Sequence, residues 1–216
     1  TLNGWIQKGF LVILREKMSE VLQLFPTPVY KNNLGLPEDL SHVNYRRTHL
    51  DNGWIADDEE YLLQDNTLKS LIDNEIEIYL RNVLRLKKTV HLKHQNSWVL
   101  LHKKGDFSPK HYHKNSWLSG IYYHTVNENS GYFKVLDAPP FSWTCSSMNP
   151  ESEVEEFNFI NSMSYTFCPE PGDIYLFPSH LNHLSLPNES DDDRVCIVFN
   201  YTLHGTWGET TERITI

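Results

Sequence analysis

The stretch GDFSPKHYH at residues 105–113 has a counterpart in GDIYLFPSHLNH at residues 172–183. The first carries His111 and His113, whose side chains would share one face of an extended strand because they are two positions apart. The second ends on His183. Two adjacent ligands and one distant ligand are typical of a β-barrel that binds a catalytic metal and leaves coordination positions open. We therefore predict a metal site of three histidines; the alternative is surface or core histidines in a His-rich chain.

The rest of the chain predicts a mainly β (α+β) fold. Strand-like runs separated by turn residues extend from about residue 90 onward. They are Gln95–His102, Leu118–Thr125, Tyr132–Leu136, Ser162–Cys168, Asp173–Phe177, Asn182–Ser185 and Val195–Leu203. Before them, apolar residues recur every three or four positions from Thr67 to about Leu86 and predict a helix that backs a sheet. This order indicates a β-sandwich or jelly roll with N-terminal helices packed outside.

The N-terminal third is less regular. Residues 22–31 carry two prolines and predict an extended edge segment. Residues 38–65 are polar, and the acidic run at 57–60 suits a helix N-terminus. Met18 resembles a natural start, so we interpret residues 1–17 as an upstream extension and 18–216 as one domain. Within it we expect an N-terminal strand and helical region (18–90), a jelly-roll core (91–205) and a C-terminal tail (206–216).

Composition narrows the range of partners. The net charge of −9 and the lack of a dense basic stripe predict no nucleic-acid partner. One local basic cluster, interpreted as a solvated helix end, comprises Arg81, Arg85, Lys87, Lys88 and Lys93. The longest apolar run, at residues 10–14, is too short to span a membrane. The three cysteines, Cys145, Cys168 and Cys196, lack C-x-x-C spacing, which predicts core thiols in a reducing, cytoplasmic compartment.

Two families show similar motifs. The histidine stretches fit the cupin pattern in part, but Trp117 and Leu118 stand where cupins place a glutamate ligand, and His180 replaces a glycine. The chain is more similar to the iron(II) and 2-oxoglutarate-dependent oxygenases, whose fold is the double-stranded β-helix. These typically carry His-x-Asp, a distal histidine and an arginine about ten residues further on. Here Arg194 follows the distal His183 by eleven residues.

The surrounding sequence resembles one branch of these oxygenases, with phage and bacterial members. The similar segments are HKNSWLSGIYY at 113–123, FPS at 177–179, residues 194–200 and LFPTPVY at 24–30, so that the resemblance covers roughly residues 20–205. It implies a double-stranded β-helix, Fe(II) as the metal, 2-oxoglutarate as a small-molecule cosubstrate, and a location in a bacterial or infected host cytosol.

The resemblance also implies roles for individual residues. His113 stands where most of the superfamily has aspartate, so three neutral imidazoles would leave the iron its full double charge, which the 2-oxoglutarate dianion could neutralise. Asp106 is the alternative carboxylate ligand. Arg194 would clamp the far carboxylate of 2-oxoglutarate with two parallel hydrogen bonds; otherwise it is an ion-pair partner of the acidic run at 189–193. Tyr123 would donate to the same carboxylate or is a core tyrosine, and His180 would contact the metal ligands from behind or form a pocket wall.

These expectations predict a dioxygenase that hydroxylates its substrate and releases succinate and carbon dioxide. The alternatives are a cupin-type three-histidine metalloenzyme that does not use 2-oxoglutarate, and a non-enzymatic binding barrel. The determinants of the prime substrate would lie in loops around 36–66 and 138–160. Four aromatic residues are candidates for the substrate mouth: Tyr112, Trp117, Phe141 and Trp143.

Overall fold

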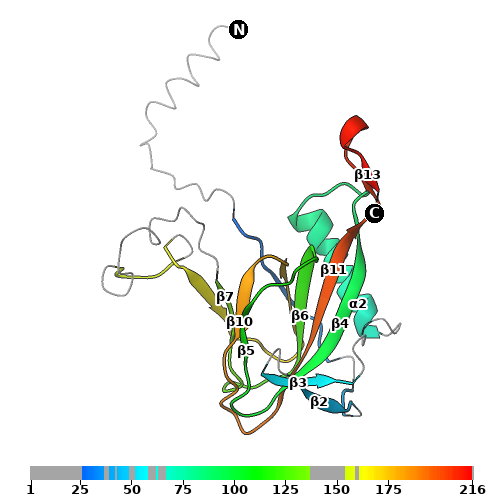
Figure 1. The fold of residues 1–216 in the computed structure, drawn as a ribbon. Coiled ribbons are helices and arrows are strands. Elements are labelled where there is room, and N and C mark those ends of the chain that lie inside the picture. Colours follow the sequence, from blue (N-terminus) through cyan, green and yellow to red (C-terminus); the bar gives the residue numbers. More distant parts are fainter. Residues whose placement is uncertain are drawn as a thin grey trace, which may run out of the picture.

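The computed structural model describes residues 26–36, 39–41, 43–48, 52–57, 62, 67–136, 154–158 and 161–215. Two antiparallel sheets face each other in a jelly roll (Figure 1). The larger sheet has the order β1 (Tyr30–Asn33), β9 (Asp173–Pro178), β6 (Leu118–Thr125), β11 (Arg194–His204), β4 (His91–His102), β3 (Gly53–Ala56) and β2 (Tyr45–Thr48). The smaller sheet has the order β5 (Ser108–His111), β10 (Asn182–Ser185), β7 (Phe133–Leu136) and β8 (Ser164–Phe167).

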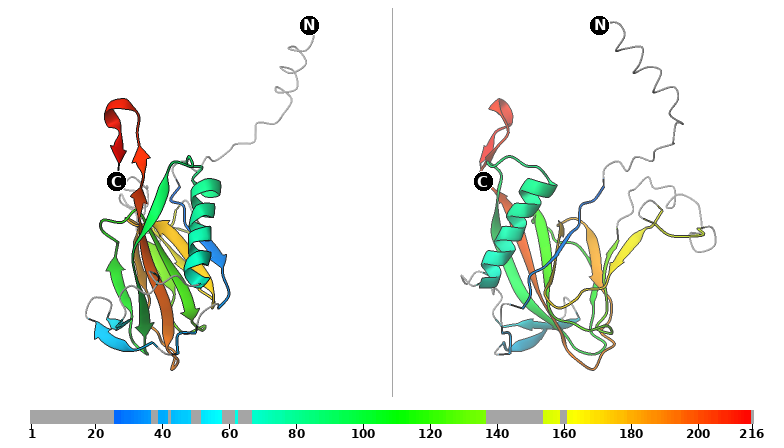
Figure 2. Two further views of the ribbon diagram at one scale, coloured as in Figure 1. Left: turned by 90° about the vertical axis from the view of Figure 1, so that its right-hand side faces the viewer. Right: turned by 180° about the vertical axis from the view of Figure 1, so that it is seen from behind.

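One helix covers the outer face of the larger sheet (Figure 2). Helix α2 (Thr67–Ile78) continues as a π-helical turn, η2 (Tyr79–Val83). Its buried side chains Leu68, Ile72 and Ile76 share one apolar cluster with outward-facing residues of β6 and β11, such as Tyr122 and Phe199. The predicted packing of an N-terminal helix outside a mainly β fold is thereby confirmed.

The second apolar cluster fills the space between the sheets. It includes Ile121 and Tyr123 of β6, which point inward because successive strand residues alternate between faces. Phe133 of β7 meets them from the smaller sheet. The first six residues of β6 are all buried, so this strand is buried on both faces.

Most predicted strands occur with shifts of one or a few residues at their ends. Strands β6 and β10 have the predicted bounds, whereas β4 begins four residues earlier than predicted, at His91. The prediction missed β2 and β3, which lie in the polar region 38–65 and extend the sheet beyond β4. The C-terminal tail carries a further strand pair, β12 (Thr206–Trp207) and β13 (Ile214–Thr215).

Three smaller expectations have mixed outcomes. Cys196 is buried as predicted, but Cys168 is exposed, because it follows the end of β8. Arg81 of the basic cluster donates to the carbonyls of Lys87 and Val90 and so ties the turn after η2 to the end of the helix. No helix in the described part of the chain has the length and apolar character needed to cross a membrane. Residues 1–17, Phe141, Trp143 and Cys145 lie outside the described residues.

Candidate active site

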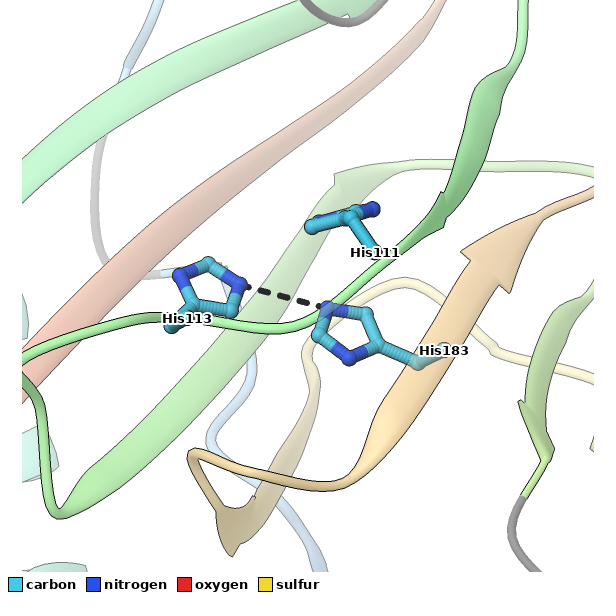
Figure 3. A group of neighbouring side chains, drawn as sticks. All are labelled: His111, His113 and His183. Carbon is cyan, nitrogen blue, oxygen red and sulfur yellow. Dashed lines mark hydrogen bonds between the residues drawn. The ribbon is translucent and has the colours of Figure 1, made fainter.

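Three histidines meet between the two sheets (Figure 3). His111 ends β5 and lies directly opposite His183 of the neighbouring strand β10. His113 lies beyond the end of β5, in the following loop, where its backbone N–H donates to the carbonyl of Ser179. The expectation that one strand would carry both histidines is therefore wrong for His113, yet their potential ligand atoms lie within 4.8 Å of one another.

Hydrogen bonds to the backbone orient two of the rings. Nδ1 of His111 lies 2.7 Å from the Pro109 carbonyl, and Nδ1 of His183 lies 2.8 Å from the Leu181 carbonyl. A carbonyl only accepts, so both Nδ1 atoms carry the proton and both Nε2 atoms keep a lone pair. Histidine metal ligands usually have such a second hydrogen bond, which fixes both tautomer and ring direction.

The distances fit ligands of a single ion. Nε2 of His113 lies 3.2 Å from Nε2 of His183. Imidazole nitrogens bound at right angles to one ion, each about 2.1 Å from it, would be separated by about 3.0 Å. The indole of Trp98 stacks on His113 with ring centroids 5.9 Å apart and supports the ring from its other side.

Burial keeps two of these imidazoles neutral. It is the main cause that lowers the pKa of His183 to about 3 and that of His113 to about 4, and the neighbouring His111 lowers both further. Metal binding requires neutral imidazole, so neither ring holds a proton that the ion must displace at neutral pH.

Asp106 does not join the histidines. Its carboxylate pairs with the guanidinium of Arg47 at 2.7 Å and accepts from the backbone N–H of Lys103 at 3.0 Å. Among the described residues, the potential metal-binding group is made of histidines alone. The expectation of Asp106 as an alternative ligand is not supported by this position.

Arg194 begins β11 and is almost completely buried, with 1% of its surface exposed. Its Nη1 donates to the carbonyls of Ser130 and Leu186, and its Nη2 lies 2.7 Å from Nδ1 of His102. Among the described residues, its Nε has no hydrogen-bond partner and no carboxylate forms a salt bridge with it, although the charge of Asp106 acts on the guanidinium from further away. The position is therefore not that of a surface ion-pair residue, and burial lowers the pKa of the guanidinium.

The hydroxyl of Tyr123 is a second buried polar group that forms no hydrogen bond of standard geometry with the described residues, although the Ser185 side chain lies close enough to lower its pKa. The side chain points into the space between the sheets and is 1% exposed. Burial raises the pKa of Tyr123 above its usual range, while the charge of Arg194 opposes that shift. Buried polar groups are nearly always hydrogen-bonded, so these two donors are candidates for contact with a polar ligand.

A small cavity of about 20 Å³ adjoins the three histidines. Its wall continues to Ser108 and Ser185, which are opposite each other on β5 and β10. Ser108 in turn lies 3.4 Å from Nε2 of His102, the residue that contacts Arg194. A chain of side-chain contacts thus leads from the histidines toward the guanidinium.

A larger groove of about 610 Å³ lies on the other side of His113. Tyr112 and Trp117, two of the predicted mouth residues, line it together with Lys114 and His180. No acidic residue is among its described lining residues. His180 is thus a groove wall, as expected, and lies outside the histidine group.

Comparison with protein families supplies the chemistry of this arrangement. Residues 96–200 match a family described as "Putative 2OG-Fe(II) oxygenase". This matched stretch, which carries His111, His113, His183 and Arg194, resembles the 2OG-Fe(II) oxygenases. These oxidoreductases use iron(II) and 2-oxoglutarate, and the grouping of His111, His113 and His183 fits the His-x-His and distal histidine motif.

Solved oxygenase structures share the fold. A 2OG-Fe(II) oxygenase family protein from Burkholderia pseudomallei matches with a TM-score of 0.52 and 10% identity, covering 81% of this chain and 84% of its own. The epimerase SnoN from nogalamycin biosynthesis matches with a TM-score of 0.53 and 15% identity, covering 86% of this chain and 82% of its own. HygX from Streptomyces hygroscopicus matches with a TM-score of 0.51 and 11% identity, covering 82% of this chain and 83% of its own. That structure has nickel, 2-oxoglutarate and hygromycin B bound. None of the curated proteins compared with this chain matches its sequence.

The sequence analysis missed His102, Ser108 and Ser185. His102 ends β4 and is the direct cross-strand partner of Arg194. Its only signal in the sequence was a position at the end of a predicted strand, and strand pairing cannot be read from that. The two serines reach the cavity because β5 and β10 pair through the histidines.

Proposed function

We propose that this protein is an iron(II)- and 2-oxoglutarate-dependent dioxygenase that hydroxylates its substrate with release of succinate and carbon dioxide. His111, His113 and His183 would hold the iron through their ring nitrogens. When bound, the iron and 2-oxoglutarate supply the oxidising chemistry: one oxygen atom of dioxygen goes to succinate and the other into a substrate C–H bond. The protein residues bind, orient and shield the reactants.

The observation that carries this proposal is the pair of unpartnered buried donors, Nε of Arg194 and the hydroxyl of Tyr123. Three protein acceptors take three of the five N–H groups of the guanidinium. The two that remain are the number that a carboxylate needs for two parallel hydrogen bonds. The far carboxylate of 2-oxoglutarate would accept from both Arg194 and Tyr123.

Charge balance supports a dianionic cosubstrate. Three neutral imidazoles leave a bound iron(II) its full double charge, and the buried Arg194 adds another positive charge without a carboxylate partner. An unpaired buried charge is unfavourable by several kcal/mol. A ligand with one carboxylate toward the metal and one toward Arg194 would offset the charge of the guanidinium and one of the two charges of the iron. In a three-histidine enzyme without 2-oxoglutarate, the guanidinium would keep its contacts with Ser130, Leu186 and His102, but its charge would have no carboxylate from a cosubstrate.

The prime substrate would bind in the groove beside His113. Its volume of about 610 Å³ lies within the usual range for small-molecule sites, roughly 300–1,000 Å³. A substrate against Tyr112 and Trp117 would lie next to one of the proposed iron ligands. HygX binds its hygromycin B together with metal and 2-oxoglutarate, which is the kind of ternary complex we propose.

The test uses the iron-loaded protein and its Arg194→Gln variant. Under anaerobic conditions, 2-oxoglutarate should produce a saturable charge-transfer absorbance with wild type, and the variant should require a much higher concentration. In air, wild type should form succinate, and a substrate screen should raise that rate. Absence of both the absorbance and succinate would contradict the proposal and leave the two non-2-oxoglutarate alternatives.

A further inference from the structure

His102 occupies a position from which it can control the guanidinium of Arg194. The two residues are direct partners in the antiparallel pairing of β4 and β11. Nη2 of Arg194 lies 2.7 Å from Nδ1 of His102, and the imidazole is fully buried, with 0% exposed. The contact is therefore shielded from water.

The chemistry of the contact fixes the state of the ring. A guanidinium has donors and no acceptor, so Nδ1 of His102 must accept and must carry no proton. The proton of the neutral ring then lies on Nε2, which faces the hydroxyl of Ser108 at 3.4 Å. Ser108 lines the cavity beside the histidine cluster. His102 thus lies between the cavity wall and Arg194.

The surrounding backbone holds the imidazole in place. A Cβ atom on Gly53 would lie 2.6 Å from Cδ2 and 2.9 Å from Nε2 of His102, so the absence of a side chain at this position leaves room for the ring. The side-chain amide of Asn188 donates to the His102 carbonyl at 2.9 Å. Ring and backbone are therefore both fixed, as a residue that orients another side chain requires.

We propose that His102 is a positioning residue for cosubstrate binding, which rests on the proposed role of Arg194. Carbonyls of Ser130 and Leu186 hold one end of the guanidinium, and His102 holds Nη2. Together they determine which N–H groups remain for a ligand, namely Nε–H and one on Nη2. Without the acceptor at Nδ1, the orientation of the guanidinium plane would no longer be fixed. Its Nε–H and free Nη2–H would then not be preorganised for a carboxylate.

Three variants separate this role from packing. Asn places its side-chain oxygen close to the position of Nδ1, Gln places it nearer Nε2, and Leu fills the space without any acceptor. We expect His102→Leu and His102→Gln to raise the dissociation constant for 2-oxoglutarate about tenfold, the effect of about one hydrogen bond. His102→Asn should stay within about threefold of wild type. Iron affinity and the rate at saturating 2-oxoglutarate should change little in all three.

The readout is anaerobic titration of 2-oxoglutarate into the iron complex, with thermal unfolding and iron affinity recorded for each variant. Equal affinities in all three variants and wild type, or equal weakening in Asn and Leu, would overturn the inference. Arg194→Gln is the reference. If it leaves the affinity unchanged, the proposed anchor itself fails. If it weakens binding while His102→Leu and His102→Gln do not, only the role of His102 is refuted. If the His102→Leu variant does not fold, the difference in 2-oxoglutarate affinity between His102→Asn and His102→Gln still tests the role of His102.

Discussion

Replacing Tyr123 with phenylalanine should raise the free energy of unfolding of the cosubstrate-free protein and weaken its binding of 2-oxoglutarate. The Tyr123 hydroxyl is buried and forms no hydrogen bond of standard geometry with the described residues, its nearest polar neighbour being the side chain of Ser185. An unsatisfied buried polar group is unfavourable by about 1–3 kcal/mol. Its removal should therefore raise the free energy of unfolding by about 1 kcal/mol, which corresponds to roughly 2–4 °C in melting temperature for a domain of this size.

The same change should reduce affinity for 2-oxoglutarate. A hydrogen bond to a carboxylate contributes about 1.5–3 kcal/mol, so Tyr123→Phe should raise the dissociation constant by roughly tenfold to 150-fold. The assay is anaerobic titration of the iron complex, together with thermal unfolding in the absence and presence of 2-oxoglutarate. Ligand-induced stabilisation should shrink in the variant because it scales with occupancy.

Tyr122→Phe is the matched control. Tyr122 is the neighbouring residue on β6, is fully buried, and faces the helix side of the sheet, where its hydroxyl donates to the Gly35 carbonyl at 2.5 Å. Its loss should destabilise the protein by about 1 kcal/mol and leave 2-oxoglutarate affinity unchanged. If Tyr123→Phe behaves like this control, destabilising without an effect on affinity, Tyr123 is an ordinary core residue and our reasoning is refuted.

Three further predictions concern other parts of the site. The lowered pKa values of His183 (about 3) and His113 (about 4) lie below the value near 6.5 in the unfolded chain, so the unfolded state takes up protons first. The metal-free protein should therefore lose stability as pH falls from about 6.5 toward 4, by at most about 1.4 kcal/mol per pH unit for each histidine. Urea unfolding should show a smaller loss of stability in His183→Gln than in wild type. Equal losses in the two proteins would contradict this prediction. Gly131→Ala should destabilise by a few kcal/mol, because its φ of 81° disfavours a side chain and a Cβ would lie 2.7 Å from Nη1 of Arg194; an unchanged melting temperature would refute the tight contact. Trp117→Ala should lower substrate-stimulated succinate formation and leave the affinity for 2-oxoglutarate within about twofold of wild type; loss of both would place Trp117 in the structural core instead.

The sequence predicted the fold where periodicity was strong. Strand β6 contains the strand-forming residues Ile121, Tyr122 and Tyr123, and helix α2 has apolar residues at helical spacing, so both followed from local pattern alone. Strands β2 and β3 did not, because they are four residues long and β2 is largely exposed. Pairing with β4, which no local pattern encodes, gives them their place in the sheet.

The site shows the same division. The spacing of His111 and His113 and the later His183 predicted that the three would meet, and the structure brings them together. The strand geometry assumed for His113 was wrong, because β5 ends at His111 and a contact with Ser179 positions the loop that follows. His102 could not be predicted, since its contact with Arg194 depends on the register of β4 against β11.

The central claim is that one ion and one 2-oxoglutarate molecule fit between the histidines and the buried donors. The most direct measurement is an anaerobic crystal structure of the protein with iron(II) and 2-oxoglutarate, with the metal located by anomalous scattering. We predict an ion bound by the ring nitrogens of His111, His113 and His183, and a distal carboxylate that accepts from Nε of Arg194 and the hydroxyl of Tyr123. A metal bound elsewhere, or a bound 2-oxoglutarate that leaves both of these donors without a partner, would contradict the account.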